Sequence, residues 1–203
     1  MQKAIDPKNF YSAIHARASG ELLRLLDGFY SNIEDGLFEL AFRNESKTQQ
    51  RQTVELMREL RFRRKHLIKT FGKRVQLAGV GWYGKADYGP EMIEERMMAN
   101  GMAAKCRAHF GPVLQSIADR THAATDQLMS REALPLSPEE VSYHFVMSCR
   151  SVKFDKHSIA VVQDLFCRFV LDRLGAIYGS IHQELIDAGF EPVSPDMALP
   201  SSA

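Results

Sequence analysis

The glycines of one short segment have the spacing most suggestive of chemistry. Gly79-Val80-Gly81-Trp82-Tyr83-Gly84 fits the pattern GxGxxG. In dinucleotide-binding proteins this pattern follows a β-strand and opens a helix, so that free amide groups meet a pyrophosphate. Here a helical pattern precedes it, and Trp82 and Tyr83 fill the variable positions. We therefore interpret 79–90 as a flexible connection between helices.

An alternative for the same segment is an exposed aromatic loop. In that case Trp82 and Tyr83 would dock on a partner or on a second protomer, because loops often carry binding residues. This interpretation predicts that Trp82→Ala leaves thermal stability nearly unchanged and weakens association.

Metal-binding and catalytic patterns do not emerge from the sequence. Di-metal helical bundles need Glu-x-x-His on two helices, and the nearest pattern, Asp119-x-x-His122, stands alone. The three cysteines, Cys106, Cys149 and Cys167, are far apart and form no CxxC pair. We expect no metal site, no cofactor and no enzymatic activity.

The most basic segment spans 58–74, where Glu59 is the single acid among eight basic residues. On a helix, four of these lie opposite Leu60 and Phe71 in a stripe about 24 Å long. The favoured interpretation is a solvated face opposite an acidic partner; the alternative is a surface that follows a phosphate backbone or seats a cyclic nucleotide. The candidate binding residues are Arg58, Arg61, Phe62, Lys65, Lys69 and Lys73.

Two residues of this segment are unusual for a solvated face. Phe62 lies among the basic residues, and Arg64 lies within the apolar stripe, where an unpaired guanidinium would cost several kcal/mol. We predict ion pairs from Asp35 or Glu39 of the preceding helix to Arg61 or Arg64. Phe38 and Phe42 lie on the same side as Asp35, which suggests that a second protomer covers the hairpin there.

Hydrophobic periodicity predicts a long helical hairpin at the N-terminal side. Apolar residues recur every three or four positions from Glu21 to Arg43, and again from Gln49 to Ala78. The short polar segment between them indicates that the two helices pair antiparallel.

The rest of the chain also has helical patterns. One helix should run from about Glu91 to Leu128, with a kink or stop at Gly111-Pro112. Ser137-Pro138-Glu139-Glu140 is a strong start signal for a helix that ends near Arg150. The last and longest helix should begin at Asp155 and end at Ala188, with Gly189 after it. No segment alternates at period two, so no sheet is expected.

These elements predict an all-α bundle of about five to six helices, built on the long N-terminal hairpin and a long C-terminal helix. We expect a single helical domain over 1–190 and a disordered tail over 191–203. The composition, with 45% hydrophobic residues and a net charge of +1, is that of a soluble globular protein. The absence of a signal sequence and of a long apolar run favours a cytoplasmic location without membrane contact.

Two blocks of sequence are specific enough to point to a known family. The first includes Glu34-Asp35-Gly36-Leu37-Phe38-Glu39-Leu40-Ala41 and Met57-Arg58-Glu59-Leu60-Arg61-Phe62-Arg63-Arg64-Lys65. The second includes Leu136-Ser137-Pro138-Glu139-Glu140 and Leu185-Ile186-Asp187-Ala188-Gly189. Together these blocks resemble the bacterial family DUF1631. The resemblance extends from about Leu22 to Pro192 and indicates the amino-terminal portion of longer proteins. The loop at 79–90 and the Met-rich stretch 92–102 depart from the family pattern.

The resemblance implies a bacterial cytosolic protein without an established activity, and an association with cyclic-dinucleotide signalling. Together with the residues above, it favours a non-enzymatic regulatory or adaptor module that acts through helix-face contacts with an unknown protein partner, as a homodimer. The alternative is an anion binder that holds a cyclic dinucleotide or nucleic acid on the basic face.

Overall fold

Helices make up most of the chain that the structure describes. The structure is a computed structural model, and it describes residues 6–43, 46–125, 127–150, 152 and 156–192. The α-helices are α1 (Pro7–Arg43), α2 (Lys47–Ala78), α3 (Ile93–Thr125), α4 (Pro138–Cys149), α5 (Lys156–Phe169) and α6 (Gly175–Asp187). Short 3₁₀ turns follow α2, precede α4 and separate α5 from α6. No strand occurs in these ranges, so the all-α prediction is confirmed.

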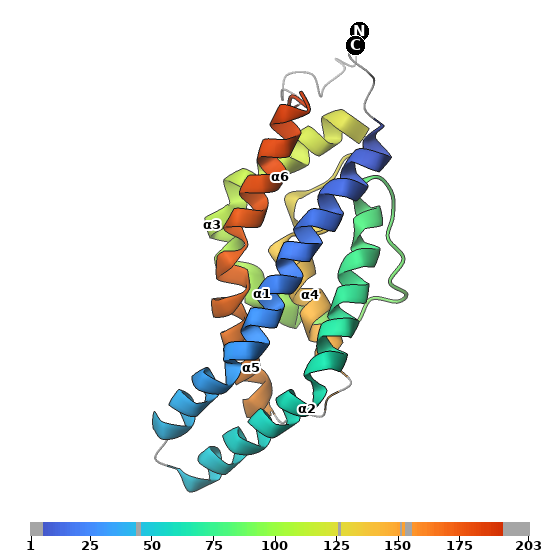
Figure 1. Cartoon of the computed structure of the whole chain (residues 1–203). Helices are drawn as coiled ribbons and strands as arrows, with labels where there is room; N and C mark the ends of the chain where they lie inside the picture. The colour runs from blue at the N-terminus through green and yellow to red at the C-terminus, as the bar shows by residue number, and fades with distance from the viewer. Residues whose placement is uncertain (1–5, 44–45, 126, 151, 153–155, 193–203) are drawn as a thin grey trace, which may run out of the picture.

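The N-terminal hairpin is formed by α1 and α2 (Figure 1). Leu22, Leu26, Phe29, Ile33 and Leu37 of α1 are buried, as their spacing predicts. The predicted stripe of α2 is buried too, at Leu56, Leu60, Leu67 and Phe71. The far end of the hairpin projects beyond the other helices, and Phe38 there is 55% exposed.

The start of α1 differs from the prediction by more than three turns, because the helix begins at Pro7 and not near Glu21. Tyr11, Ile14 and Ala18 are buried and extend the apolar stripe towards the N-terminus. An N-cap signal was present in the sequence: Oδ1 of Asp6 accepts a hydrogen bond from the backbone N–H of Lys8 at 3.1 Å, and Pro7 follows it.

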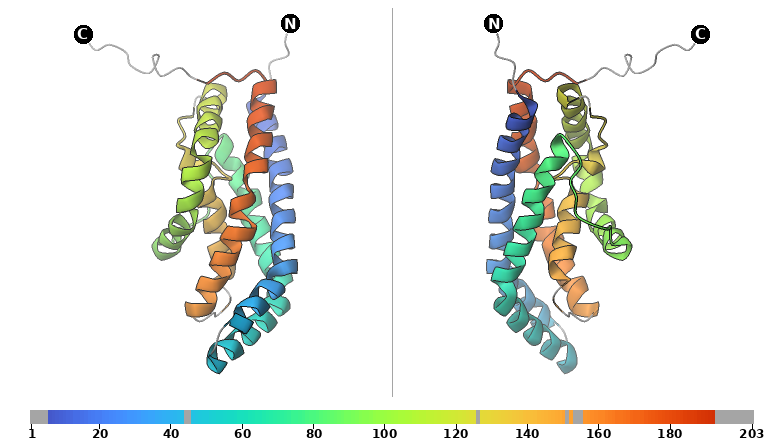
Figure 2. Two further views of the ribbon diagram at one scale, coloured as in Figure 1. Left: turned by 90° about the vertical axis from the view of Figure 1, so that its left-hand side faces the viewer. Right: turned by 90° about the vertical axis from the view of Figure 1, so that its right-hand side faces the viewer.

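Helix α4 lies at the centre of the bundle, between the hairpin and the later helices (Figure 2). Nine of its twelve residues are buried, and they point in all directions around the helix. Ser137 caps it as predicted, because its hydroxyl accepts the backbone N–H of Glu140 at 3.2 Å.

The later helices differ from the prediction in two places: α3 does not stop at Gly111-Pro112, and the expected C-terminal helix is divided in two. Helix α3 continues through Pro112, where Pro112 and Ala108 are both exposed, so water can hydrate the carbonyl that proline leaves unpaired. The single C-terminal helix expected over 155–188 is instead two helices, α5 and α6, separated by a 3₁₀ turn at Leu171–Arg173. Close to this turn Phe110 of α3 packs against Gly175, where an added Cβ would lie 3.0 Å from its ring. The expected cap Asp155 lies outside the described residues.

The end of α6 follows the prediction. Gly189 has φ +78° and donates to the carbonyl of Ile186, while Phe190 donates to the carbonyl of Leu185. This pair of bonds is a Schellman motif, which needs a residue such as glycine in the left-handed region. Phe190 then packs on Phe10 and Tyr11, so the two ends of the described chain meet. Most of the predicted tail over 191–203 lies outside the described residues.

Candidate functional site

The exposed side of α2 carries a row of basic residues around one phenylalanine. The buried stripe of α2 faces the bundle, so residues about half a turn away from it face solvent. Phe62 is 84% exposed on this side. We name the following set the α2 basic row: Arg58, Phe62, Lys65, Lys69 and Lys73, all exposed.

The cations of the α2 basic row differ from the other basic residues of 58–74 in their partners. Arg61 forms an ion pair with Glu34, with Nε to Oε1 at 2.8 Å, and the pKa of Glu34 is lowered by this hydrogen bond. Arg63 pairs with Glu59 on the same helix. Within the described ranges, no ion pair reaches Arg58, Lys65, Lys69 or Lys73. Arg74 forms no ion pair in these ranges either, but it is half-buried and lies over the rings of Tyr88 and Tyr143. The exposed lysine and arginine side chains of 58–74 that lack an ion pair are therefore those of the row.

Arg64 is half-buried and paired, as the cost of an isolated guanidinium requires. Its Nη2 donates to Oδ1 of Asp27 at 2.6 Å and to the hydroxyl of Ser31 at 2.9 Å. Bridges between acids of α1 and Arg61 and Arg64 of α2 thus exist, but the predicted acids were wrong. Both Glu34 and Asp27 face α2; Glu34 directly precedes the predicted Asp35, and Asp27 lies about two turns before it.

Asp35 and Glu39 lie on another side of α1. They line a cavity of about 570 Å³ between α1 and α5, together with Arg24, Asp164, Arg168 and Arg173. The cavity therefore mixes both signs of charge. The side chain of Phe42, predicted to share this face, lies outside the described residues.

The segment after α2 contradicts the idea of an exposed tryptophan. Trp82 is 1% exposed and stacks on Tyr11 with ring centroids 5.4 Å apart. Its Nε1 donates to Nδ1 of His15 at 3.0 Å. Trp82 is thus a core residue, because α1 extends far enough towards the N-terminus to cover it. Tyr83 is half-buried, with its hydroxyl 3.5 Å from that of Ser12.

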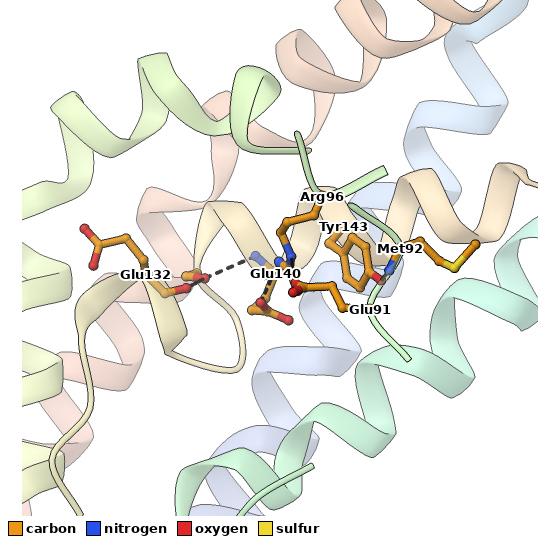
Figure 3. A network of polar contacts seen from close by, with 7 residues as sticks. Glu91, Met92, Arg96, Glu132, Glu140 and Tyr143 are labelled. Atoms are coloured by element: carbon orange, nitrogen blue, oxygen red, sulfur yellow. Dashed lines mark hydrogen bonds and ion pairs between the residues drawn. The ribbon is translucent and has the colours of Figure 1, made fainter. Parts of the chain in front are cut away.

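A second polar cluster joins the start of α3 to α4 and was not predicted from the sequence (Figure 3). The guanidinium of Arg96 lies 3.8 Å above the ring of Tyr143. It donates to Glu91 at 2.6 Å and to Glu140 at 2.7 Å, while the hydroxyl of Tyr143 accepts the backbone N–H of Met92 at 3.1 Å. Burial raises the pKa of Glu140, and Arg96 opposes that shift.

This cluster fixes the direction in which α3 leaves the loop. Glu140 and Tyr143 are one turn apart on α4, so one guanidinium can contact both. Because Arg96 is engaged on three sides, the cluster serves to position a helix. Its residues are distant in sequence, and no motif or spacing could have linked them.

Two properties of the described residues bear on metals and membranes. No group of three or more His, Cys, Asp or Glu side chains within them has the geometry to hold a metal ion. None of the described helices combines the length and the apolar character that crossing a bilayer requires.

Comparison with known proteins gives one match. Residues 89–189 match the family model described as "Protein of unknown function (DUF1631) N-terminal domain". The resemblance is thereby confirmed over α3 to α6, and the Met-rich stretch 92–102, which was expected to depart from the family, lies inside the match. The motifs quoted from α1 and α2 lie outside it. No curated protein and no solved structure matched the chain.

Proposed function

We propose that the chain is a non-enzymatic adaptor. The premise is that residues 89–189 match the model of the DUF1631 N-terminal domain. The α2 basic row binds an acidic surface of a protein partner. The observation that carries this proposal is the 84% exposure of Phe62 among four cations without an acidic partner in the described chain.

The row has the form of a helix-face recognition site. Its members recur at steps of three and four residues, which places them in one line over about 23 Å of helix at 1.5 Å per residue. Acidic residues on a partner would pair with the cations, and an apolar pocket would cover Phe62. Aromatic anchors surrounded by charge are typical of residues that dominate binding energy.

Paired neighbours make the row a defined site. The neighbouring arginines are neutralised by ion pairs: Arg61 by Glu34, Arg64 by Asp27 and Arg63 by Glu59. The positive electrostatic potential of the row is therefore narrow and directed away from the bundle. Such a strip favours fast, oriented encounter with an acidic partner.

A nucleotide ligand is the second candidate, because Phe62 could stack on a base while the cations hold phosphates. The shape of the site favours a protein. Small-molecule sites are concave, and the four best-formed cavities of the described ranges are lined by no residue of the row. A cyclic dinucleotide on this convex face would remain largely in solvent.

We also place the adaptor in the bacterial cytoplasm. This location fits the free thiols of Cys106, Cys149 and Cys167, because a reducing compartment keeps cysteines unpaired.

Site-specific photocrosslinking tests the proposal directly. A benzoylphenylalanine placed at Phe62 should crosslink to one discrete protein in cells, and the same probe at exposed Gln183 on α6 should not. The double variant Lys65→Glu with Lys69→Glu should abolish that crosslink, whereas Lys8→Glu with Lys85→Glu, which removes the same net charge elsewhere, should retain it. The captured protein should present an acidic surface.

Fluorescence anisotropy at low salt decides between protein and nucleotide. Labelled single-stranded DNA, duplex DNA and cyclic-di-GMP are the probes. We expect no binding tighter than about 100 μM, since four cations on one helix hold only a few phosphates. Micromolar binding that the Lys65→Glu, Lys69→Glu variant loses, and that falls steeply with salt, would overturn the adaptor in favour of an anion binder.

A further inference from the structure

The first half of α3 presents a second exposed surface, and this one is apolar. Ile93 is 73% exposed and Met97 is 70% exposed. Gly101, Ala104 and Ala108 follow at steps of four, three and four, and all are exposed. At 100° per residue, these five residues lie within an arc of about 80°. We call them the α3 apolar face.

The α3 apolar face is held rigidly away from the bundle. The opposite side of the same helix is buried at Ala99, Ala103 and Cys106, against α4 and its neighbours. Arg96, tied to Glu91 and Glu140, fixes the first turns (Figure 3). Figure 2 shows this half of α3 at the outer side of the molecule. Exposed apolar faces on rigid elements are typical of sites that contact another chain.

The α3 apolar face is complementary in shape to a second copy of itself that runs in the opposite direction. The large residues, Ile93 and Met97, lie at one end, and the small residues, Gly101, Ala104 and Ala108, lie at the other. If two copies pair antiparallel about residue 100, Met97 of one fits between Gly101 and Ala104 of the other. Ile93 then fits between Ala104 and Ala108 in the same way.

The charges at the edge of the face match the same arrangement. Glu94 is an exposed acid near one end, and Lys105 is an exposed cation near the other. Pairing about residue 100 brings Glu94 of each copy within about 1.5 Å, along the axis, of Lys105 of the other. Lys105 already contacts Asp172 at 3.2 Å but is 82% exposed, so it can reach both carboxylates.

We propose that the α3 apolar face is the interface of a homodimer, in which two α3 helices pair antiparallel about a two-fold axis near Asn100. Gly101 lies close to that axis, where the absence of a side chain lets the backbones approach. An interface of this kind is isologous, so each contact occurs twice. The α2 basic row could not serve, because two copies would place like charges opposite each other.

Sedimentation and light scattering over a concentration range test the dimer. One helix face per protomer makes a small interface, so we expect a Kd of about 10–100 μM. Gly101→Leu should weaken association at least tenfold and leave the melting temperature unchanged or higher, because an added Cβ at Gly101 meets no atom within 4 Å of its own chain.

Gly179→Leu is the matched control. Gly179 also has open space at its Cβ and lies in the exposed side of α6, so its replacement adds the same bulk elsewhere. It should dimerise as the parent chain does. A parent chain that stays monomeric at 1 mM, or a Gly101→Leu variant that associates as well as Gly179→Leu, would overturn the proposal.

Disulfide trapping tests the direction of the pairing. Gly101→Cys should form a cross-linked dimer under mild oxidation, because the two copies meet near the axis. Gln115→Cys should not form one. Position 115 lies 14 residues further along the helix, so in the antiparallel pair the two substituted positions are roughly 45 Å apart. A parallel pair would cross-link at both positions and contradict the antiparallel dimer. Neither outcome bears on the α2 basic row, which lies on another helix.

Discussion

His15 holds the N-terminal end of the hairpin together through two hydrogen bonds, one in which its ring donates and one in which its ring accepts. One ring nitrogen, Nε2, lies 2.7 Å from the carbonyl of Val75 and must donate, while Nδ1 accepts from Trp82. His15 is therefore neutral, and burial lowers its pKa. One imidazole thus connects α1, the last turn of α2 and the turn that follows it.

Replacement of Trp82 should destabilise the fold, contrary to the expectation from the sequence alone. Trp82→Ala removes a buried indole and should lower the free energy of unfolding by about 3–5 kcal/mol. Trp82→Phe keeps most of the packing but leaves Nδ1 of His15 without a donor, at a cost of about 1–3 kcal/mol. Urea unfolding measures both. Tyr83→Phe, on the half-buried neighbour, serves as the control and should change little.

His144 should make the protein sensitive to acid. It is fully buried on α4, and both ring nitrogens lack a hydrogen-bond partner in the described chain. Burial, followed by the nearby Arg74 and Arg96, lowers its pKa to about 3. The unfolded chain, with a histidine pKa near 6.5, therefore binds a proton between about pH 6.5 and 3 that the folded chain does not.

The stabilising effect of a neutral His144 is complete above about pH 6.5 and decreases as the pH falls through this window. At pH 5 the expected loss is about 2 kcal/mol relative to pH 7.5. Urea titrations at the two pH values measure it. His144→Phe should reduce the measured difference by about this amount, while the part that comes from the buried His15 remains. His157→Phe, on the exposed side of α5, should keep the whole difference. An unchanged pH dependence in His144→Phe would contradict the explanation.

At the scale of elements, periodicity predicted the main buried stripes of the hairpin but missed the first turns of α1. The stripes of α1 and α2, the Ser137 cap and the Gly189 terminus could be predicted because each depends on residues close in sequence. The break between α5 and α6 could not, because buried residues recur every three or four positions through it. Close to the break, Gly175 packs against Phe110, which is some 65 residues away in sequence, and a contact at that separation leaves no local signal.

The candidate site was also predictable only where its features depend on residues close in sequence. Exposure of the α2 basic row follows from its position opposite Leu60 and Phe71. The partners of Arg61 and Arg64 depend on how α1 is rotated against α2, and the sequence does not encode that rotation locally. Trp82 was misplaced because its cover, Tyr11 and His15, comes from turns of α1 that were not expected to be helical.

The contact between α1 and the end of α2 should be sensitive to a single methyl group. A Cβ at Gly79 would lie 2.6 Å from the ring of His15, which its two hydrogen bonds hold in place. Gly79→Ala should therefore lower the free energy of unfolding by about 1–3 kcal/mol. Gly28→Ala, where the added Cβ meets nothing, should raise it by up to about 1 kcal/mol. Similar effects at the two positions would contradict the close approach.

At the scale of the whole molecule, one continuous core unites all six helices. Phe29 of α1 packs on Phe145 of α4 and Phe166 of α5, with ring centroids 6.0 Å and 5.9 Å apart. From α2, the guanidinium of Arg74 lies 5.5 Å from the ring of Tyr143. The family match begins only at residue 89, so the matched helices depend on a hairpin that the match does not include.

A fragment of residues 89–192 should therefore fail to fold alone, as expected of a single domain over 1–190. Loss of the hairpin would expose Val141, Phe145 and Phe166, all buried in the whole chain, and would strip α4 of one side. We expect reduced helicity by circular dichroism, strong binding of a hydrophobic dye and no cooperative thermal transition. Co-expression with residues 6–84 should restore all three properties, because the hairpin supplies the missing surface. A fragment that melts cooperatively without the hairpin would show that the chain contains two folding units, joined where the match begins.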